Sequence, residues 1–248
     1  MATEGVEVHV FADRDALVRA GAEALAEAIT AAVAARGVCR IALSGGSTPK
    51  PVFALMAATG RPSAEVWRRT HVFWVDERCV PPDHADSNYR MACEALFDHV
   101  LPASIHRMAG EADPDRAAAD YEALLRAHFD VAPGEVPVFD VVLLGMGDDG
   151  HIASLFPGNE ALDERERLVV APYVDKFGAH RVTLTYPVLE AARERLVLVS
   201  GAGKHPAVTR VLGGHAAPAA DPLPAQRLRP TQGRTRWFLD RAAAEGRS

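Results

Sequence analysis

Four short apolar runs, each ending at a turn of glycines or charged residues, constrain the fold of this chain more than any other feature. The runs cover residues 38–43, 71–75, 139–144 and 195–200. Continuous apolar segments of this length are typical of parallel strands that are buried on both faces. Helical patterns separate them, and this alternation predicts a single α/β domain over residues 1–248, with a doubly wound, mainly parallel sheet and helices on both faces.

Three flanking segments extend this prediction. Residues 6–11 alternate polar and apolar side chains, which indicates an edge strand. Residues 14–36 have apolar side chains at helical spacing between a candidate N-cap, Asp13, and a candidate C-cap, Gly37, so we expect one long amphipathic helix. Residues 235–240 predict a last strand or a short helix against the core.

The remaining segments carry weaker signals. Residues 168–171 and 181–186 alternate like strands, and residues 114–128 form a polar, alanine-rich pattern that we interpret as a peripheral helix. Residues 213–230 are rich in Ala, Pro and Gly and predict a mobile loop.

Composition restricts the class of partner. The chain has 248 residues, of which 48% are hydrophobic and 24% charged, enough for a sizeable core, and its net charge is −6. We expect neither a nucleic-acid nor a membrane partner, because both nucleic acids and anionic membranes require clustered positive charge and no apolar run approaches the ~20 residues that span a bilayer. Three cysteines without a C-x-x-C pair indicate neither a disulfide framework nor a thiolate zinc site, so we expect a cytoplasmic protein.

The turn after residues 139–144 combines acid, base and flexible backbone. It begins at Gly145 and carries Asp148, Asp149 and His151. Open α/β sheets bind their ligands at the carboxyl ends of their strands, and a neutral imidazole is well matched to accept a proton near pH 7. An ordinary Asp-Gly turn accounts for the local spacing equally well.

A second glycine turn, Gly45, Gly46, Ser47 and Thr48, lies between a predicted strand and a predicted helix. Its backbone N–H groups, its hydroxyls and the positive end of the helix dipole suit a phosphate group. A well-capped turn without a ligand is the alternative. Because the chain lacks both Gly-x-Gly-x-x-Gly and the P-loop pattern, we do not expect a nucleotide.

Charged residues also follow or open other predicted strands. Asp76 and Arg78 come after residues 71–75, where they form either an ion pair at the sheet edge or part of a site. Arg181 and Lys204 are either surface charges or ligands of an anion. No His, Cys or Asp cluster has a clear metal-ligand spacing, so we expect neither a metal nor another cofactor.

Several of these motifs together resemble one family. Gly-x-Gly-x-Asp-Gly-His-x-Ala-Ser-Leu-Phe-Pro, preceded by Ser-Gly-Gly-Ser-Thr-Pro and Asp-Glu-Arg, is similar to the motifs of the 6-phosphogluconolactonase and glucosamine-6-phosphate deaminase family. The resemblance implies a modified Rossmann-like fold of the phosphosugar isomerase type and a small phosphosugar lactone as substrate. Both a monomer and a homodimer are compatible with the sequence. It implies a catalytic group of His151, Asp149, Asp148, Asp76 and Arg78 and a phosphate-binding group of Gly45, Gly46, Ser47, Thr48, Arg181 and Lys204.

Phe156 favours one reaction of that family. Deaminases tend to have Gly-His-Ile-Ala-Phe-Asn-Glu-Pro where this chain has Gly-His-Ile-Ala-Ser-Leu-Phe-Pro, so Phe156 stands at the position of their carboxylate. We therefore expect hydrolysis of 6-phospho-D-glucono-1,5-lactone, by water that His151 activates, in the oxidative pentose phosphate pathway. Glucosamine-6-phosphate deamination is the alternative reaction. A non-catalytic phosphosugar-binding protein is the third interpretation, which the retained Asp76, Asp148 and His151 disfavour.

Overall fold

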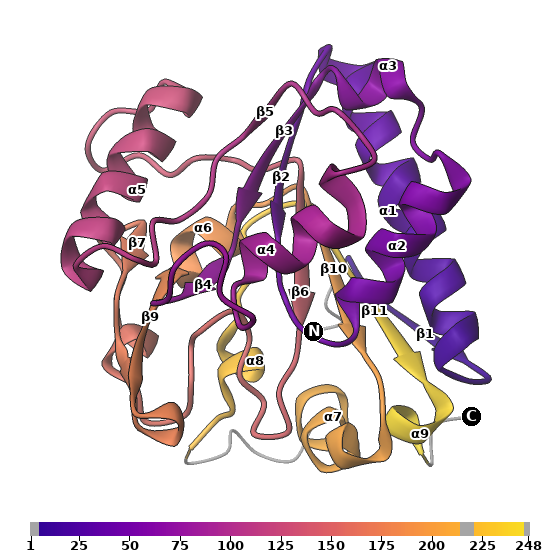
Figure 1. Ribbon diagram of the computed structural model, residues 1–248. Helices are drawn as coiled ribbons and strands as arrows, with labels where there is room; N and C mark the ends of the chain where they lie inside the picture. Colours follow the sequence, from indigo (N-terminus) through magenta and orange to yellow (C-terminus); the bar gives the residue numbers. More distant parts are fainter. Residues whose placement is uncertain (1–4, 214–220, 246–248) are drawn as a thin grey trace.

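A seven-stranded parallel sheet forms the centre of the computed structural model, which describes residues 5–213 and 221–245 (Figure 1). All its strand pairs are parallel, which requires crossover connections over the faces of the sheet. In spatial order the strands are β1 (Val6–Phe11), β11 (Arg234–Asp240), β10 (Glu194–Val199), β6 (Val141–Gly145), β2 (Cys39–Leu43), β3 (Thr70–Trp74) and β5 (Ser104–Ile105).

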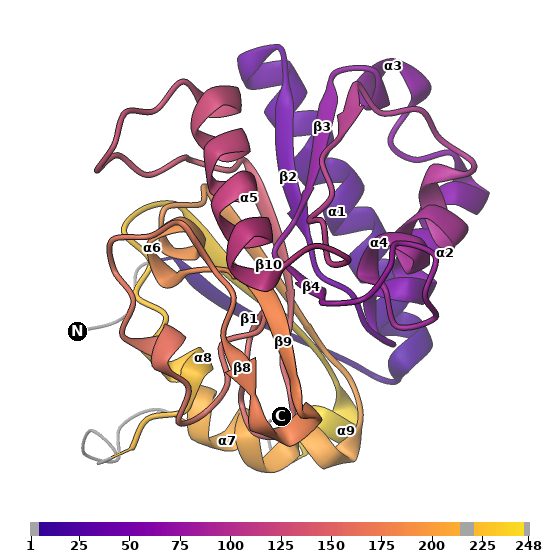
Figure 2. The same ribbon diagram turned by 60° about the vertical axis from the view of Figure 1, so that its left-hand side comes forward.

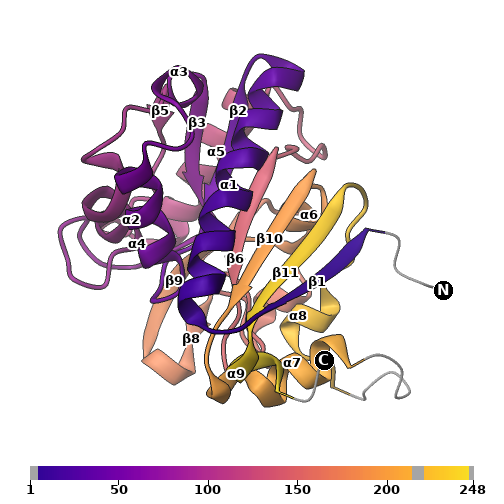
Figure 3. The same ribbon diagram turned by 90° about the vertical axis from the view of Figure 1, so that its right-hand side faces the viewer.

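Helices cover both faces of this sheet, which confirms the predicted doubly wound α/β fold. The helices α1 (Arg14–Arg36) and α2 (Pro49–Thr59) lie on one side, and α5 (Pro114–Phe129) and α6 (Tyr186–Glu190) lie on the other (Figures 1 and 3). The shorter helices are α3 (Ala64–Trp67), α4 (Asn88–Ala92), α7 (His205–Leu212), α8 (Pro224–Arg227) and α9 (Arg241–Ala244).

Helix α1 has the limits that its capping residues predict. The Asp13 carboxylate accepts a hydrogen bond from the Ala16 backbone N–H at 2.8 Å. At the other end, Gly37 adopts a left-handed conformation with φ 75°, and its N–H donates to the Val33 carbonyl at 2.8 Å. These bonds satisfy backbone groups that a helix end otherwise leaves without partners.

A second, antiparallel sheet lies beside the first (Figure 2). Residues 168–171 and 181–186 were predicted to be strand-like and contribute to it, but their pairing into a separate sheet was not predicted. Its strands are β4 (Asp76–Arg78), β9 (Ala179–Leu184), β7 (Val169–Val170) and β8 (Tyr173–Val174). Asp76 and Arg78 therefore belong to a strand of their own, not only to the turn after β3. Pairing with β9 satisfies the backbone of this polar segment and places Arg78 opposite Arg181.

Two sequence interpretations are corrected by the packing. Helix α5 is not peripheral, since its Tyr121 is buried: the Tyr121 hydroxyl accepts from the Trp74 N–H at 2.9 Å and donates to the His106 carbonyl at 3.1 Å. The segment 213–230 is not a uniform loop, because Pro224–Arg227 forms α8; residues 214–220 lie outside the described residues.

The C-terminal segment is settled as a strand, since β11 pairs with both β1 and β10. Edge strand β1 is confirmed. Over the residues that the structure describes, none of the helices has the length and apolar character needed to cross a membrane.

Candidate active site

The candidate site lies where the winding of the large sheet reverses. From β2 the chain runs outward through β3 and β5, and later it continues on the other side of β2 through β6, β10 and β11. Open α/β sheets bind ligands outside the carboxyl ends of the strands at such a reversal. A cleft of about 190 Å³ is found at this place, and the turns after β2, β3, β6 and β10 line it.

The cleft brings together most of the residues that the sequence indicated. The predicted residues that line it are Gly45, Gly46, Ser47, Thr48, Asp76, Arg78, His151 and Lys204. Three predicted residues do not line it. Asp149 contacts Nδ1 of His151, Asp148 contacts Lys176, and Arg181 lies opposite Arg78 on the adjacent strand.

His151 is oriented by Asp149 and not by Asp148. The Nδ1 atom of His151 lies 2.5 Å from Oδ1 of Asp149, which also accepts the His151 backbone N–H at 3.1 Å. Burial alone would raise the pKa of Asp149, but hydrogen bonds from His151 and Lys176 outweigh it and hold this pKa well below its usual value. Because Asp149 is then ionised, Nδ1 carries the proton and donates it, which leaves Nε2 as an acceptor.

Lys176 links the two aspartates, and sequence reasoning missed it. Its Nζ atom lies 3.0 Å from Oδ1 of Asp148 and 3.0 Å from Oδ2 of Asp149. These bonds lower the pKa of Asp148 and raise that of Lys176. Lys176 comes from the turn between β8 and β9, so only the folded chain reveals the contact.

An aromatic wall connects His151 to Arg181. The Phe156 ring stacks on His151 with centroids 4.0 Å apart and an interplanar angle of 28°, and Phe177 meets Phe156 edge-on at 5.7 Å. The Arg181 guanidinium lies 4.8 Å from the centroid of Phe177. Burial, followed by the charge of Arg78, lowers the pKa of Arg181, so an anion between the two guanidinium groups would be favourable.

The Asp149–His151 pair requires glycine at position 147. A Cβ atom on Gly147 would lie 2.0 Å from Nδ1 of His151 and 2.5 Å from Oδ1 of Asp149. The Gly147 N–H also donates to the His151 carbonyl at 2.9 Å, which closes the turn. The glycine therefore serves close approach, as its place in a turn after a buried strand suggested.

Asp76 holds two of the turns together. Its Oδ2 accepts the Ser154 hydroxyl at 2.8 Å, and its carbonyl accepts Nδ2 of Asn88 at 2.9 Å. Asn88 in turn packs so close to Gly45 that a Cβ on the glycine would lie 1.7 Å from its Oδ1. Asn88 also lines the cleft; the sequence indicates its segment as the start of a helix, but Asn88 was not among the predicted site residues.

The glycine turn after β2 and the Lys204 turn after β10 are each fixed by a neighbouring element. Arg14 at the start of α1 donates from Nη2 to the Ser47 carbonyl at 2.7 Å. Thr48 is the N-cap of α2, but its hydroxyl makes no capping bond. Near Lys204, the Asp240 carboxylate accepts the Ser200 hydroxyl at 2.5 Å and the Gly201 N–H at 3.0 Å.

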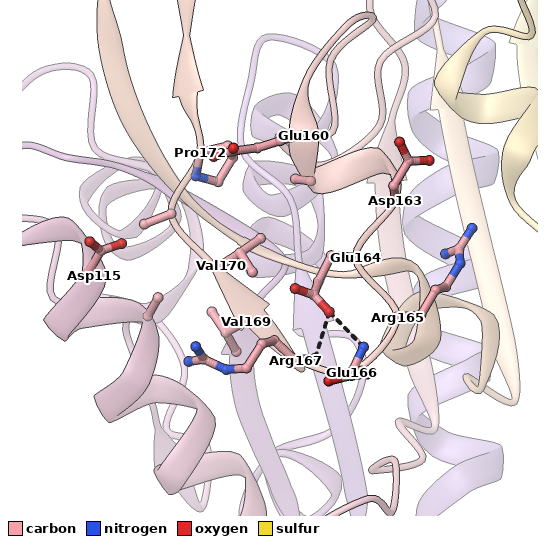
Figure 4. Close-up of a pocket in the computed structure, with 13 residues that line it drawn as sticks. Asp115, Glu160, Asp163, Glu164, Arg165, Glu166, Arg167, Val169, Val170 and Pro172 are labelled. Atoms are coloured by element: carbon pink, nitrogen blue, oxygen red, sulfur yellow. Dashed lines mark hydrogen bonds between the residues drawn. The ribbon is translucent and has the colours of Figure 1, made fainter.

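A larger hollow of about 630 Å³ lies elsewhere, and its chemistry does not suit an anion (Figure 4). Among its charged lining residues the acidic ones outnumber the basic ones: they are Asp115, Glu160, Asp163, Glu164 and Glu166, against Arg165 and Arg167. Two of its charged side chains already have partners: Oε1 of Glu164 accepts the N–H groups of Glu166 and Arg167 at 2.6 and 2.9 Å, and Arg167 pairs with Glu122 at 2.7 Å. The smaller cleft is therefore the better candidate for an anionic substrate.

Comparison with known proteins identifies the family to which the chain belongs. A family model described as glucosamine-6-phosphate isomerases/6-phosphogluconolactonase matches residues 12–237. The chain belongs to this family. Among its members, the 6-phosphogluconolactonases of Nostoc sp. and Mycobacterium tuberculosis are 45% and 43% identical to this chain, over 95% and 96% of it and 96% of each relative.

Solved structures of the glucosamine-6-phosphate isomerase/6-phosphogluconolactonase family have the same fold. The 6-phosphogluconolactonase of Trypanosoma brucei superposes with a TM-score of 0.87 at 32% identity, covering 98% of each chain. A monomeric glucosamine-6-phosphate deaminase also superposes, with a TM-score of 0.78 at 20% identity, over 97% of this chain and 100% of that one. Because both kinds of enzyme have this fold, the fold cannot decide the reaction, and the site residues must.

Proposed function

We propose that the protein is a 6-phosphogluconolactonase, which hydrolyses 6-phospho-D-glucono-1,5-lactone to 6-phospho-D-gluconate in the oxidative pentose phosphate pathway. The observation that carries this proposal is the Asp149–His151 pair at a cleft whose other walls supply a helix N-terminus and Lys204. The names of the relatives described above support the same substrate.

His151 acts as the general base. Its Nε2 atom accepts a proton from a water molecule while the water oxygen attacks C1 of the lactone. Asp149 keeps Nδ1 protonated and stabilises the imidazolium that forms. Arg78, with backbone N–H groups of the glycine turn that ends in His151, stabilises the oxyanion on the former carbonyl oxygen.

Collapse of the tetrahedral intermediate opens the ring. The bond between C1 and the ring oxygen breaks, and the imidazolium of His151 returns its proton to that oxygen. The products are the carboxylic acid, which ionises, and a hydroxyl group on C5. The chain has no serine in a Gly-x-Ser-x-Gly turn, so direct attack by water is preferred over an acyl-enzyme.

The phosphate group is held at the other end of the cleft. The residues Gly45–Thr48 direct backbone N–H groups and hydroxyls from the N-terminus of α2, and Lys204 adds a point charge. Arg181, which lies opposite Arg78 across β4 and β9, adds positive charge from behind the cleft wall. Binding the phosphate there places C1 of the lactone towards His151.

Phe156 favours the lactonase over the deaminase reaction. Its ring covers one face of the His151 imidazole, so the position at which deaminases are expected to have a carboxylate is apolar. Sugar ring-opening by a histidine needs that carboxylate, whereas attack of water on an activated ester does not.

One assay tests the proposal. Purified protein is given freshly prepared 6-phosphogluconolactone, and product formation is followed after subtraction of the spontaneous hydrolysis rate at each pH. We expect protein-dependent hydrolysis and no ammonia release from glucosamine 6-phosphate. Ammonia release that follows the protein through purification would establish the deaminase instead, and binding without either turnover would establish a phosphosugar-binding protein.

A further inference from the structure

Three histidines from separate segments meet at the edge of the large sheet opposite the active-site cleft. His71 lies near the amino end of β3, His106 follows β5, and His128 lies in the last turn of α5. One ring nitrogen of each lies within 4.8 Å of the other two. Their positions in the sequence show no ligand spacing, because pairing of β3 with β5 and packing of α5 bring them together.

The cluster has an ordered arrangement. The Ser104 hydroxyl lies 2.6 Å from Nδ1 of His71 and 2.7 Å from Nε2 of His106, so it links these two rings. The His128 ring meets His71 and His106 edge-on, with centroids 4.7 and 4.9 Å apart. Its Nε2 atom is buried and has no hydrogen-bond partner in the described part of the chain. A buried nitrogen without a partner is unfavourable unless something binds it.

The surroundings keep the three rings neutral. Burial lowers the pKa of His71 and His106 and lowers that of His128 to about 4. The nearby Arg40, whose guanidinium lies 5.2 Å from the centroid of Phe129, acts in the same direction on His71 and His128. Neutral imidazole is the form that binds metals, so protons do not compete near pH 7. Arg40 opposes any added cation, and the affinity is correspondingly limited.

We propose that His71, His106 and His128 bind one divalent transition-metal ion, with Zn²⁺ as the representative ion. Imidazole nitrogen suits ions of this class, and three histidines leave a fourth position for water or the Ser104 hydroxyl. Bonds of about 2.0–2.1 Å require the nitrogens to approach to roughly 3.3 Å in a tetrahedral site, so the three rings, whose nitrogens lie within 4.8 Å of one another, move closer together when the ion binds.

The role of the ion is structural. It ties the amino end of β3, the segment after β5 and the end of α5 to one point, and these elements are distant in the sequence. Because it binds the folded state, the ion raises the melting temperature. The active-site cleft lies beyond the opposite ends of the strands, so the reaction rate stays the same.

Zinc titration of chelator-treated protein tests the proposal. Wild type and a His151→Ala variant are titrated with ZnCl₂ by calorimetry, the variant serving to remove the active-site imidazole as an alternative ligand. We expect one equivalent bound by both proteins and a rise in Tm. His128→Gln and His71→Gln weaken the affinity about tenfold or more. His99→Gln, the matched control, removes an exposed histidine outside the cluster and leaves the affinity unchanged.

Two further measurements make the outcome decisive. Anomalous diffraction at the zinc edge of soaked wild-type crystals locates the ion even if a variant fails to fold. Circular dichroism identifies a variant that fails to fold, and His106→Gln is then titrated in its place. The proposal is overturned if zinc affinity is the same in all the cluster variants, if binding disappears with His151→Ala, or if no anomalous peak lies among the three rings.

Discussion

At the scale of single residues, the two neighbouring aspartates have different contacts, and this difference can be measured. His151→Ala removes the proposed base, so we expect kcat to fall about 10²–10⁴-fold while KM changes little. Asp149→Asn should also reduce kcat strongly, because the amide no longer keeps the proton on Nδ1. Asp148→Asn is the matched control: it makes the same chemical change one residue away, at a carboxylate that contacts Lys176 but not His151.

Steady-state kinetics on the lactone, corrected for the buffer rate, checks this prediction. A His151→Ala protein with near wild-type kcat would remove His151 from the mechanism and leave Asp76 as the next candidate base. Equal losses in the two asparagine variants would contradict the assignment of Asp149 as the orienting residue.

Lys176 is expected to act through Asp149 as a positioning residue. Lys176→Met removes an exposed, charge-assisted hydrogen bond, so we expect a kcat loss on the order of tenfold, smaller than that of His151→Ala, with KM nearly unchanged. Lys176→Arg should restore most of the rate. If Lys176 had a purely structural role, Lys176→Met would lower stability without a selective loss of kcat, and Lys176→Arg would not restore the rate.

The depressed pKa of Asp149 predicts how the stability of the fold depends on pH. Its folded-state pKa is depressed, so its stabilising contribution is complete above the unfolded pKa near ~3.9 and is lost as pH falls through the folded value. The difference in unfolding free energy between wild type and Asp149→Asn should therefore decrease as pH falls below about pH 4. Urea unfolding at several pH values between about pH 5 and pH 2 measures it; a difference that stays constant over this range would contradict the depressed pKa.

The sequence predicted which residue types meet in the site but not how they pair. Asp148 and Asp149 are both close enough in sequence to reach His151, and only the path of the backbone through Gly147 selects Asp149. Lys176 gave no signal because a lysine in an exposed turn is ordinary until the fold places it beside the aspartates.

At the scale of elements, the buried Arg195 joins α6 to β10 and β11. It is fully buried, and its guanidinium donates to the Thr235 hydroxyl at 2.8 Å and to the carbonyls of Ala192 and Gln232 at 2.6 and 2.7 Å. Burial lowers its pKa to about 10, so it remains charged at neutral pH. From the sequence, Arg195 was predicted only as the first residue of an apolar strand.

We therefore expect Arg195→Met to destabilise the fold by about 3 kcal/mol or more, because several buried acceptors lose their donor. Arg193→Met, at an exposed neighbour in the turn before the same strand, is the control and should change stability by less than about 1 kcal/mol. The free energy of unfolding in urea measures both. Equal effects in the two variants would mean that the buried hydrogen bonds contribute little.

Capping residues and apolar runs predicted the helices and strands in which they occur. Asp13 and Gly37 fixed the ends of α1 through capping chemistry, and β2, β3, β6 and β10 were indicated by their apolar runs. The small antiparallel sheet was predicted only in part: the segments of β7 and β9 alternate like strands, but β4 is short and polar and becomes a strand only through pairing with β9. For the same reason, the meeting of Arg78 with Arg181 required the structure.

At the scale of the whole molecule, a chain of net charge −6 binds its proposed dianionic group in a cleft with local positive charge. Lys204 lines that cleft, and its replacement by alanine removes a charge-assisted hydrogen bond worth about 1.5–3 kcal/mol. Lys204→Ala should therefore raise KM about ten- to a hundredfold and change kcat little. Lys50→Ala is the matched control, since it removes the same charge from an exposed position on α2 outside the cleft.

The same reasoning predicts the substrate preference and its dependence on salt. Glucono-1,5-lactone without phosphate should be a poor substrate, because the contacts of Gly45–Thr48 and Lys204 are then unused and no longer position C1 against His151. Added salt should raise KM more in wild type than in Lys204→Ala, since screening weakens an interaction that the variant has lost. Rates on both lactones at two ionic strengths test this. If wild type hydrolysed the unphosphorylated lactone as efficiently as its 6-phosphate, the glycine turn of α2 would not be the phosphate site, whatever the effect of Lys204→Ala.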